Sequence, residues 1–308
     1  MNPLRSFLLW CSTNRWVSTR LPRFRFVRHA VKRFMPGTTY DAALAEAERL
    51  GTLRIRSLLT NLGENVRDLA EAEKVCGHYL DLLDRIAALK LETHISIKPT
   101  HLGLDLDPRV CQELVLRLVR AAKERDNFIW IDMEASPYVQ QTLDLFRETR
   151  RSHDNVGICL QAYLYRTPSD IESLRALNPR IRLVKGAYRE PENVAYPKKR
   201  EVDEAYRSLA SRLMGGGDGQ ATPVAIATHD PRILADLRAL AQERGLAKDA
   251  YEFQLLYGIG RETQRQLADE GEPVRVLISY GENWFPWYMR RLAERPANIL
   301  FVLRSLFR

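Results

Sequence analysis

The segment Ile181-Arg182-Leu183-Val184-Lys185-Gly186-Ala187-Tyr188 begins as a short apolar, β-branched run and ends in polar residues. The charged stretch 201–214 that follows has apolar residues at three- and four-residue spacing, which is the period of an α-helix. The segment therefore predicts a buried β-strand, and the stretch after it predicts an amphipathic helix.

The same strand-and-helix pattern recurs along the chain without any repeat of the residues themselves. The eight apolar runs are Ile55–Glu64, Thr93–Lys98, Phe128–Glu134, Val156–Tyr163, Ile181–Tyr188, Val224–Asp230, Tyr251–Gly258 and Val274–Gly281. Helical stretches between them include Arg109–Glu124, Tyr138–Arg151, Glu201–Met214, Pro231–Arg244 and Arg261–Gly271. Strands that alternate with helices pair in parallel, because a parallel crossover needs about a dozen residues or more. Eight such units in roughly 250 residues predict an α/β fold, a closed (β/α)8 barrel of the TIM type.

An open, doubly wound sheet is the alternative arrangement of the same elements. Such a sheet needs a Gly-rich phosphate turn after its first strand, and Leu62-Gly63-Glu64-Asn65 is not one. The glycines of Met214–Gly219 follow a helix and precede a strand, which is typical of a flexible connector. We therefore expect one barrel over residues 41–308, preceded by an N-terminal helical arm over residues 1–40.

The arm differs from the rest of the chain in charge. No Asp or Glu precedes Asp41, whereas eight Lys and Arg residues do, and these eight account for the whole net charge of +8. The basic residues are Arg5, Arg15, Arg20, Arg23, Arg25, Arg28, Lys32 and Arg33, and the interleaved apolar ones include Phe7, Leu8, Leu9, Trp10, Trp16, Phe24, Phe26 and Phe34. This mixture suits the surface of an anionic membrane, where charge attraction and shallow apolar burial act together.

Other interpretations of the arm remain open. A merely solvated helix is one of them. A nucleic-acid arm is another, but no groove-reading motif follows it. In a cleaved targeting peptide, Leu4–Cys11 would be the apolar region, yet the Arg-rich residues after it lack a small-residue cleavage pattern.

The composition also narrows the class of protein. No apolar run reaches the ~18 residues that a membrane-spanning helix needs. Cys11, Cys76, Cys111 and Cys159 are scattered, with neither a CxxC pair nor Cys/His metal spacing. We therefore expect a cytoplasmic protein, or one peripheral to the inner face of the cytoplasmic membrane, with reduced thiols, no metal site and no nucleic-acid partner.

Polar side chains end nearly every predicted strand. They are Glu64, Lys98, Asp132, Gln161, Lys185, Tyr188, Thr228, His229 and Gln254. Taken singly, each has a structural explanation: Asp132 as a helix cap, Gln161 as a loop hydrogen bonder, His229 as a core histidine. Because the active sites of such barrels collect at the C-terminal ends of the strands, the set as a whole predicts a site there.

The segment Trp284–Glu294, after the last strand, predicts an aromatic and then basic helix near the same end of the barrel. Arg290 and Arg291 suit a carboxylate, because a guanidinium offers two parallel donors to its oxygens. A solvated basic face balanced by Glu294 is the alternative.

Seven segments together resemble proline dehydrogenase, and they occur in that family's order and spacing from about Met35 onward. They are Ser96-Ile97-Lys98, Ile131-Asp132-Met133-Glu134, Leu160-Gln161-Ala162-Tyr163, Arg182-Leu183-Val184-Lys185-Gly186-Ala187-Tyr188, Ala227-Thr228-His229-Asp230, Tyr251-Glu252-Phe253-Gln254 and Arg290-Arg291-Leu292-Ala293-Glu294. The N-terminal basic helices resemble the bacterial single-function members. The resemblance implies FAD, a distorted (β/α)8 barrel, oxidation of L-proline to Δ1-pyrroline-5-carboxylate in proline catabolism, and a quinone as electron acceptor.

The resemblance also implies roles for matching positions. The residues that would line the flavin are Asp132, Met133, Gln161, Arg182, Val184, Lys185, Gly186, Ala187, Thr228, His229, Gln254 and Arg291. Those that would line the substrate are Lys98, Asp132, Tyr188, Leu256, Arg290 and Arg291, with Glu64 paired to Arg290 as a gate. Lys98 and Asp132 would form an ion pair near the substrate amine, and Lys185 or Arg182 would stabilise the negative charge of the reduced flavin ring.

The substrate pocket departs from the family at four positions. Leu277 and Trp287 stand where the family has tyrosines, Pro99 stands where Leu is usual, and Arg189 stands where other members have tryptophan. One changed aromatic shifts discrimination by only ~1–3 kcal/mol, so oxidation of proline can survive while ring specificity moves toward hydroxyproline or another cyclic amino acid. Two further alternatives are a Schiff-base lyase that uses Lys98 or Lys185, and a barrel that has lost catalysis.

Overall fold

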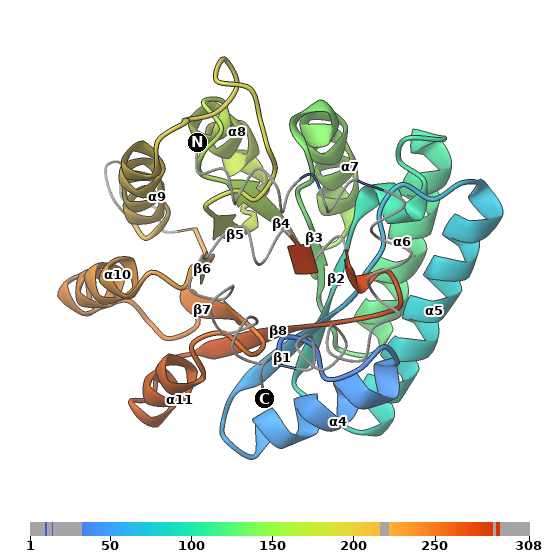
Figure 1. Ribbon diagram of the computed structural model, residues 1–308, viewed down its shortest axis with the longest axis horizontal. Helices are drawn as coiled ribbons and strands as arrows, with labels where there is room; N and C mark the ends of the chain where they lie inside the picture. Colours follow the sequence, from blue (N-terminus) through green and yellow to red (C-terminus); the bar gives the residue numbers. More distant parts are fainter. Residues whose placement is uncertain (1–9, 11–13, 15–32, 216–221, 286–287, 290–308) are drawn as a thin grey trace.

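The computed structural model describes residues 10, 14, 33–215, 222–285 and 288–289. Its strands form one closed parallel barrel in the order of the chain, with β8 paired to β1 (Figure 1). The strands are β1 (Arg56–Asn61), β2 (Thr93–Ile97), β3 (Ile129–Ile131), β4 (Val156–Gln161), β5 (Arg180–Val184), β6 (Val224–Ala227), β7 (Tyr251–Leu256) and β8 (Val274–Tyr280). The predicted (β/α)8 barrel is confirmed.

Helices surround the barrel on the outside (Figure 1). They are α4 (Tyr40–Gly51), α5 (Leu69–Ala88), α6 (Pro108–Glu124), α7 (Val139–Ser152), α8 (Thr167–Leu174), α9 (Lys199–Leu213), α10 (Pro231–Glu243) and α11 (Arg261–Asp269). Short 3-10 turns occur at η2 (Pro99–Leu102), η3 (Ser136–Tyr138) and η4 (Arg175–Leu177). The five predicted helical stretches agree with α6, α7, α9, α10 and α11 to within two residues at each end.

Local sequence signals set the starts of two of these helices. The Asp107 side chain accepts hydrogen bonds from the backbone N–H groups of Arg109 and Val110, with Pro108 as the first residue of α6. Asp230 caps α10 in the same way, and Pro231 follows it. An Asp cap satisfies N–H groups that lack helical partners, and proline at the first position costs no hydrogen bond.

The barrel wall separates two environments. Residues that point outward, such as Ile95, Ile181 and Val276, belong to the large apolar core between strands and helices. Inside the barrel a small separate cluster consists of Leu58, Trp130 and Ala225, with Phe128 and Leu277 packed against it. Because side chains alternate along a strand, other inward positions two residues away share this interior.

The largest fully buried side chain, Trp130, needs a glycine beside it. A Cβ at Gly157 on β4 would lie 2.8 Å from the Trp130 ring and 2.9 Å from the carbonyl oxygen of Arg180. The indole therefore fills the middle of the barrel where β4 has no side chain. This arrangement divides the barrel interior into a part near the C-terminal ends of the strands and a part near their N-terminal ends.

Most of the predicted arm, residues 1–40, lies outside the described residues. Its last part packs on the barrel: Phe34 and Met35 are buried, and the Phe34 ring centroid lies 5.8 Å from that of Tyr288. Gly258, between β7 and α11, has a positive φ of 78°, and a Cβ there would lie 1.8 Å from the carbonyl oxygen of Arg33. The boundary at residue 40 stays a prediction.

Within the part of the chain that the structure describes, no helix is both long enough and apolar enough to span a bilayer.

Candidate functional site

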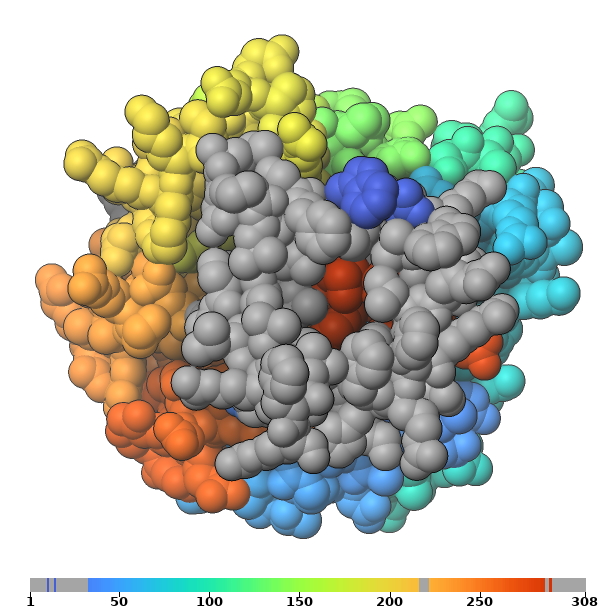
Figure 2. Space-filling view, in the orientation of Figure 1, coloured from blue at the N-terminus to red at the C-terminus, as the bar shows by residue number. Residues whose placement is uncertain are grey.

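The predicted polar side chains do meet at the C-terminal mouth of the barrel. Glu64, Lys98 and Asp132 follow β1, β2 and β3, Gln161 ends β4, Lys185–Tyr188 follow β5, and Thr228 and His229 follow β6. In Figure 1 the described chain after β8, residues 281–285 and 288–289 in dark red, runs from beside β2 toward the middle of the barrel face, and Figure 2 shows part of it near the middle of the same face. All eight strands run in one direction, so the residues that follow them lie at one end of the barrel.

An ion pair between the buried Arg182 and the half-buried Asp132 is the central feature of this mouth. Nη2 of Arg182 contacts Oδ1 of Asp132. The Ser96 hydroxyl accepts a hydrogen bond from the same Nη2 at 2.8 Å and donates one to Asp132 Oδ1 at 2.9 Å. Burial opposes the charged guanidinium, but Asp132, Cys159 and Glu252 together outweigh it and raise the pKa of Arg182. Arg182 is thus a fixed positive charge.

The polar network continues from Arg182 toward the other end of the barrel. Arg182 Nη1 donates to Gln254 Oε1 at 3.4 Å, and Gln254 Nε2 donates to Glu252 Oε1 at 2.6 Å. Glu252 in turn pairs with Arg275 at 3.1 Å. Gln254 was expected at the end of its strand, but β7 continues to Leu256 and Gln254 lies buried inside. Alternating charges thus line the barrel interior without a large excess of either sign.

The expected ion pair between Lys98 and Asp132 is wrong. Asp132 is paired with Arg182, and within the described residues no ion pair joins it to Lys98. Lys98 follows β2 and immediately precedes η2. Ser96 and Arg182 lie within their strands, and their inward side chains reach Asp132. The guanidinium of Arg182 passes over the Trp130 ring, 5.2 Å from the ring centroid.

Lys185 is held by two carboxylates. Its Nζ lies 2.5 Å from Oδ1 of Asp203 on α9 and 3.1 Å from Oδ2 of Asp230 before α10. Burial favours the neutral acids, but Lys185 and Lys199 together outweigh it, lowering the pKa of Asp203 and bringing that of Asp230 to about 2. Through these two contacts Lys185 joins the ends of β5 and β6 to α9.

Gly186 follows Lys185 with a φ of 116°. A Cβ at this position would lie 2.3 Å from the ring of Tyr163, which is itself buried. The close approach of the β5 end to this ring therefore requires glycine. Ala187 and Tyr188 continue the half-buried loop beyond it.

Buried polar atoms at this mouth that have no hydrogen-bond partner among the described residues include those of Gln161 and Ser279. Gln161 is 2% exposed; its Nε2 donates to the carbonyl oxygen of Met133 at 3.5 Å, while its Oε1 accepts nothing. Ser279 Oγ on β8 is in the same condition, and it lies two residues beyond the inward-facing Leu277. Buried polar groups are normally satisfied, so such atoms indicate a partner that is not part of the chain. The residues fit a large polar cofactor.

His229 has a defined hydrogen bond. The backbone N–H of Leu256 donates to its Nε2 at 3.0 Å, which fixes the ring against the end of β7. A neutral ring that accepts at Nε2 carries its proton at Nδ1. Thr228 Oγ1 accepts from the backbone N–H of Asp230 at 3.2 Å, so this predicted segment also shapes the start of α10.

Glu64 and Tyr188 meet across the mouth. The Tyr188 hydroxyl donates to Glu64 Oε1 at 3.4 Å, joining the loops after β1 and β5. Arg290, Arg291 and Trp287 lie outside the described residues, so the pairing of Glu64 with Arg290 stays a prediction. Trp284, Phe285, Tyr288 and Met289, from the same predicted helix, are helical and buried.

Glu134 lies buried behind the mouth and titrates near neutrality. It accepts hydrogen bonds from the Thr100 backbone N–H at 2.9 Å and the Thr100 hydroxyl at 2.6 Å. Burial nevertheless raises the pKa of its carboxyl group from 4.5 to about 7. Between these two values the folded protein holds a proton that the unfolded chain has released, so folding becomes less favourable as the pH rises through this window.

Replacing Glu134 by glutamine should therefore flatten the pH dependence of stability. A pKa raised from 4.5 to about 7 corresponds to a loss on the order of 3 kcal/mol in the free energy of unfolding across that window. Urea unfolding at about pH 5 and about pH 8 would measure it. Equal pH dependence in the Glu134→Gln variant and the wild type would contradict the assignment.

Several contributors to the site were not predicted from the sequence. Ser96 bridges Arg182 and Asp132, Asp203 and Asp230 hold Lys185, and Trp130 supports Arg182. Ser96 had a usable signal, because it lies two residues before Lys98 and hence on the same side of the strand. Asp203 had none, since it lies inside an ordinary charged helix.

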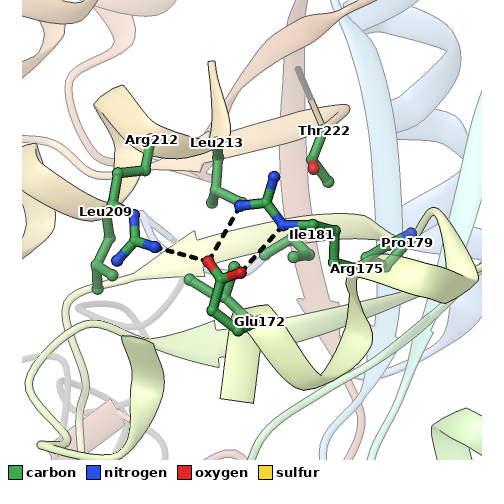
Figure 3. A pocket seen from close by; sticks show the side chains of 9 residues that line it. Glu172, Arg175, Pro179, Ile181, Leu209, Arg212, Leu213 and Thr222 are labelled. Carbon is green, nitrogen blue, oxygen red and sulfur yellow. Dashed lines mark hydrogen bonds and ion pairs between the residues drawn. The ribbon is translucent and has the colours of Figure 1, made fainter. Parts of the chain in front are cut away.

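Two other features do not make a site. A shallow depression between α8 and α9 has a volume of about 10 Å3, and Figure 3 shows that Glu172 there is engaged by Arg175 and Arg212. This volume is room for about one water molecule. Cys76, Cys111 and Cys159 are free and buried, and the described residues hold no cluster of metal-ligating side chains.

Comparison with known proteins identifies the family. The sequence model of the family described as proline dehydrogenase matches residues 43–304. The chain is 37% identical to "Proline dehydrogenase 2" of Bacillus subtilis over 302 residues, covering 98% of each chain. It is 38% identical to "Proline dehydrogenase" of Deinococcus radiodurans over 283 residues, covering 90% of each.

Solved structures share the fold. Proline utilization A from Bdellovibrio bacteriovorus, inactivated by N-propargylglycine, matches with a TM-score of 0.82 and 24% identity over 95% of this chain. A bifunctional proline utilization A protein matches with a TM-score of 0.72 and 23% identity. The chain spans only 36% and 32% of the lengths of those two chains. The match of the family model over most of the sequence and the full-length relatives above 30% identity establish that this chain belongs to the proline dehydrogenase family.

Proposed function

We propose that the protein is an FAD-dependent dehydrogenase that oxidises L-proline, or a closely related cyclic amino acid, to Δ1-pyrroline-5-carboxylate or its analogue. The observation that carries the proposal is the buried Arg182–Asp132–Ser96 network beside a buried Gln161 oxygen without a protein partner. It lies at the end of the barrel where such folds bind their substrates. The names of the full-length relatives agree with it.

Residues of this mouth have the chemistry to hold a flavin. When bound, FAD would supply the two-electron acceptor for oxidation of a carbon–nitrogen bond. Gln161 Oε1 is free to accept a hydrogen bond from an N–H group of the ligand. Arg182 is charged and immobilised, so it can stabilise negative charge nearby without moving. Lys185 contributes a second held positive charge at the edge of the mouth.

The substrate end of the site requires orientation rather than a strong base. Asp132 is held in place by Ser96 and Arg182, and Tyr188 contacts Glu64. Arg290 and Arg291 are proposed to bind the substrate carboxylate through two parallel N–H donors. Fixing the donor carbon and excluding water account for much of the rate that such a site can provide.

The decisive experiment is spectroscopic. Purified full-length protein is expected to carry about one flavin per chain, and its absorbance should bleach when L-proline is added without oxygen. Colourless protein that cannot be reconstituted with FAD would exclude the proposal. If the bound flavin is reduced by none of L-proline, hydroxyproline and pipecolate, the FAD part of the proposal stands and cyclic amino acids are excluded as its substrates.

Ring specificity is proposed to depend on Leu277. This side chain is half-buried, pairs in register with Leu58 and Leu256, and packs inside the barrel. Leucine there lacks the ring and hydroxyl of the tyrosine usual in the family, which leaves more room beside the substrate ring. A shift toward hydroxyproline or another cyclic amino acid is the second form of the proposed function.

Replacing Leu277 by tyrosine, together with Trp287→Tyr, should sharpen selectivity for proline. We expect the ratio of kcat/KM for proline to that for hydroxyproline to rise ~10-fold or more, in line with ~1–3 kcal/mol for one altered apolar contact. Leu277→Met, which keeps the volume but adds no ring, is the matched control. An unchanged ratio in the double variant would contradict the placement of Leu277 beside the substrate.

One of the two candidate lysines for the Schiff-base lyase alternative is disfavoured by its contacts. Lys185 is paired with Asp203 and Asp230, and two carboxylates stabilise its charged form, which is not a nucleophile. Lys98 remains, and borohydride trapping with a carbonyl substrate would detect a Schiff base on it.

We also propose that the basic, aromatic arm docks on an anionic membrane surface and that a quinone dissolved there accepts the electrons. Deletion of residues 1–33, which keeps the buried Phe34, should reduce binding to vesicles containing anionic lipid while sparing activity with a soluble dye acceptor. Neutral vesicles serve as the control. Unchanged binding to the anionic vesicles would assign the arm another role.

A further inference from the structure

A cavity of about 480 Å3 lies at the N-terminal mouth of the barrel, opposite the site described above. It is lined by the starts of the strands, including Arg56 on β1, Arg180 on β5 and Arg275 on β8. Its volume falls in the range of small-molecule sites, which is about 300–1,000 Å3. Trp130 lines it too, and because the same indole lies 5.2 Å from the Arg182 guanidinium, its ring separates the cavity from the site at the other mouth.

The lining of the cavity is rich in charged groups, and most of its basic residues are ion-paired. Six Lys or Arg residues and four Asp or Glu residues line it, and two of the basic residues, Arg125 and Lys248, pair with Asp84 and Glu272 outside the lining. Arg275 is paired with Glu252 at 3.1 Å, and Arg56 is paired with Glu92 at 3.5 Å. Arg180 differs from both, since no carboxylate among the described residues lies within ion-pair distance of it.

Aromatic packing positions Arg180, and Glu252, which is paired with Arg275, lies near enough to interact with the charge of Arg180 without forming an ion pair with it. Its guanidinium lies 5.3 Å from the ring centroid of Phe128. The Phe128 ring also contacts the His94 ring, with the centroids 5.2 Å apart. A cation held against an aromatic face keeps its N–H donors for other partners, because the ring interaction uses none of them. Arg180 and His94 therefore flank the same aromatic ring.

His94 offers a further donor. The indole N–H of Trp130 donates to His94 Nδ1 at 3.3 Å, so a neutral imidazole carries its proton on Nε2. Burial and the nearby charges of Arg275, Arg180 and Arg56 lower the pKa of His94 well below its ordinary value, which keeps the ring neutral. Its Nε2–H has no acceptor within the described chain.

We propose that this cavity binds a phosphate group, either inorganic phosphate or a small phosphate monoester, against Arg180 and His94. A guanidinium fork and one imidazole N–H offer three donors, which match the three terminal oxygens of a phosphate better than the two of a carboxylate. Arg56 and Arg275 are each paired with a carboxylate, so the guanidinium offered to the ligand is that of Arg180. A phosphate alone does not fill the cavity, and Leu91, Trp130 and Ala225, which also line it, provide apolar wall for an organic group.

The test is calorimetric titration of the full-length protein, as purified, with inorganic phosphate and with phenyl phosphate at constant ionic strength. Both should bind, and Arg180→Gln should weaken both by at least 10-fold, which corresponds to about 1.4 kcal/mol. Arg200→Gln is the matched control, because it removes the same charge from an exposed pair with Glu204 on α9 and should bind like the wild type. Arg180→Lys, which keeps the charge but loses the fork, should be intermediate.

Two further arms complete the experiment. Benzoate should bind more weakly than phenyl phosphate, since a carboxylate meets one donor fewer. Saturating L-proline should leave phosphate binding unchanged, since the two ligands would occupy opposite mouths. Wild-type protein that binds neither phosphate probe, equal affinity in Arg180→Gln and Arg200→Gln, or competition between proline and phosphate would each overturn the proposal. None of these outcomes depends on whether the protein oxidises proline.

Discussion

Replacement of Arg182 by methionine is expected to lower the free energy of unfolding by about 3–5 kcal/mol, the usual cost of removing one partner from a buried ion pair. The variant leaves the Asp132 carboxylate without its cation and Gln254 Oε1 without its donor. Methionine fills much of the same volume against Trp130, so the loss reports charge and hydrogen bonding rather than a cavity. Oxidation of proline should fall by at least 100-fold if Arg182 stabilises charge beside the flavin, as a lost donor does in other preorganised sites.

A double variant separates these two effects. Asp132→Asn combined with Arg182→Met removes both charges, so part of the lost stability should return, because no uncompensated buried charge is left. Activity should not return, since both side chains are assigned to the site. Urea unfolding and stopped-flow flavin reduction measure the two quantities independently. A single variant with wild-type stability would contradict the description of Arg182 and Asp132 as a buried, mutually dependent pair.

The barrel itself was predictable from the sequence for a clear physical reason. Outward positions of a barrel strand meet helices, so runs such as Ile129–Ile131 and Val224–Ala227 are apolar and short. Helices must be amphipathic to cover them, and Asp-Pro pairs mark two helix starts. Each of these signals is local, and eight repeats in order leave few alternatives.

Pairings between inward side chains were less predictable, because they depend on the layer in which each residue lies. Arg182 comes from β5 and Asp132 from the end of β3, so their contact passes over β4 and depends on both side chains reaching the same layer of the barrel interior. From the order of the strands alone, a pairing of Lys98 with Asp132 was as plausible as the observed pairing of Arg182 with Asp132, because Lys98 and Asp132 follow neighbouring strands. A list of polar strand ends therefore identifies the mouth of the site but not which charges pair there.

The cavity at the opposite mouth was missed for a related reason. Arg56 and Arg180 are the first residues of their strands, and Arg275 is the second of its strand. A basic residue at a strand start looks like an ordinary solvated end in a linear sequence. Only closure of the barrel brings three such positions from β1, β5 and β8 to one opening, so a search for function restricted to the C-terminal ends cannot find them.

Replacement of Gly186 by alanine is expected to destabilise the end of β5 and to reduce flavin binding. Its φ of 116° lies in a region that side-chain-bearing residues rarely adopt, and the new Cβ would lie 2.3 Å from the buried Tyr163 ring. Unfavourable backbone conformation and overpacking together should cost roughly 2–6 kcal/mol. Lys185, which is proposed to contact the flavin, directly precedes Gly186, so the substitution strains the loop that carries Lys185. We therefore expect both the flavin content and the midpoint of urea unfolding to fall.

Three further variants distinguish the two causes. Gly245 also has a positive φ, of 59°, but a Cβ there would meet no atom within 4 Å. Gly245→Ala should therefore lower the free energy of unfolding only by the backbone cost of about 1–2 kcal/mol. Gly51→Ala, at the end of α4 in open space, should have little effect. In the Gly186→Ala background, Tyr163→Leu should recover the overpacking part but not the backbone part. If Gly186→Ala lowers the free energy of unfolding no more than Gly245→Ala does, then the Tyr163 ring can move to accommodate the new Cβ. In that case the loop after β5 is less constrained than its packing indicates.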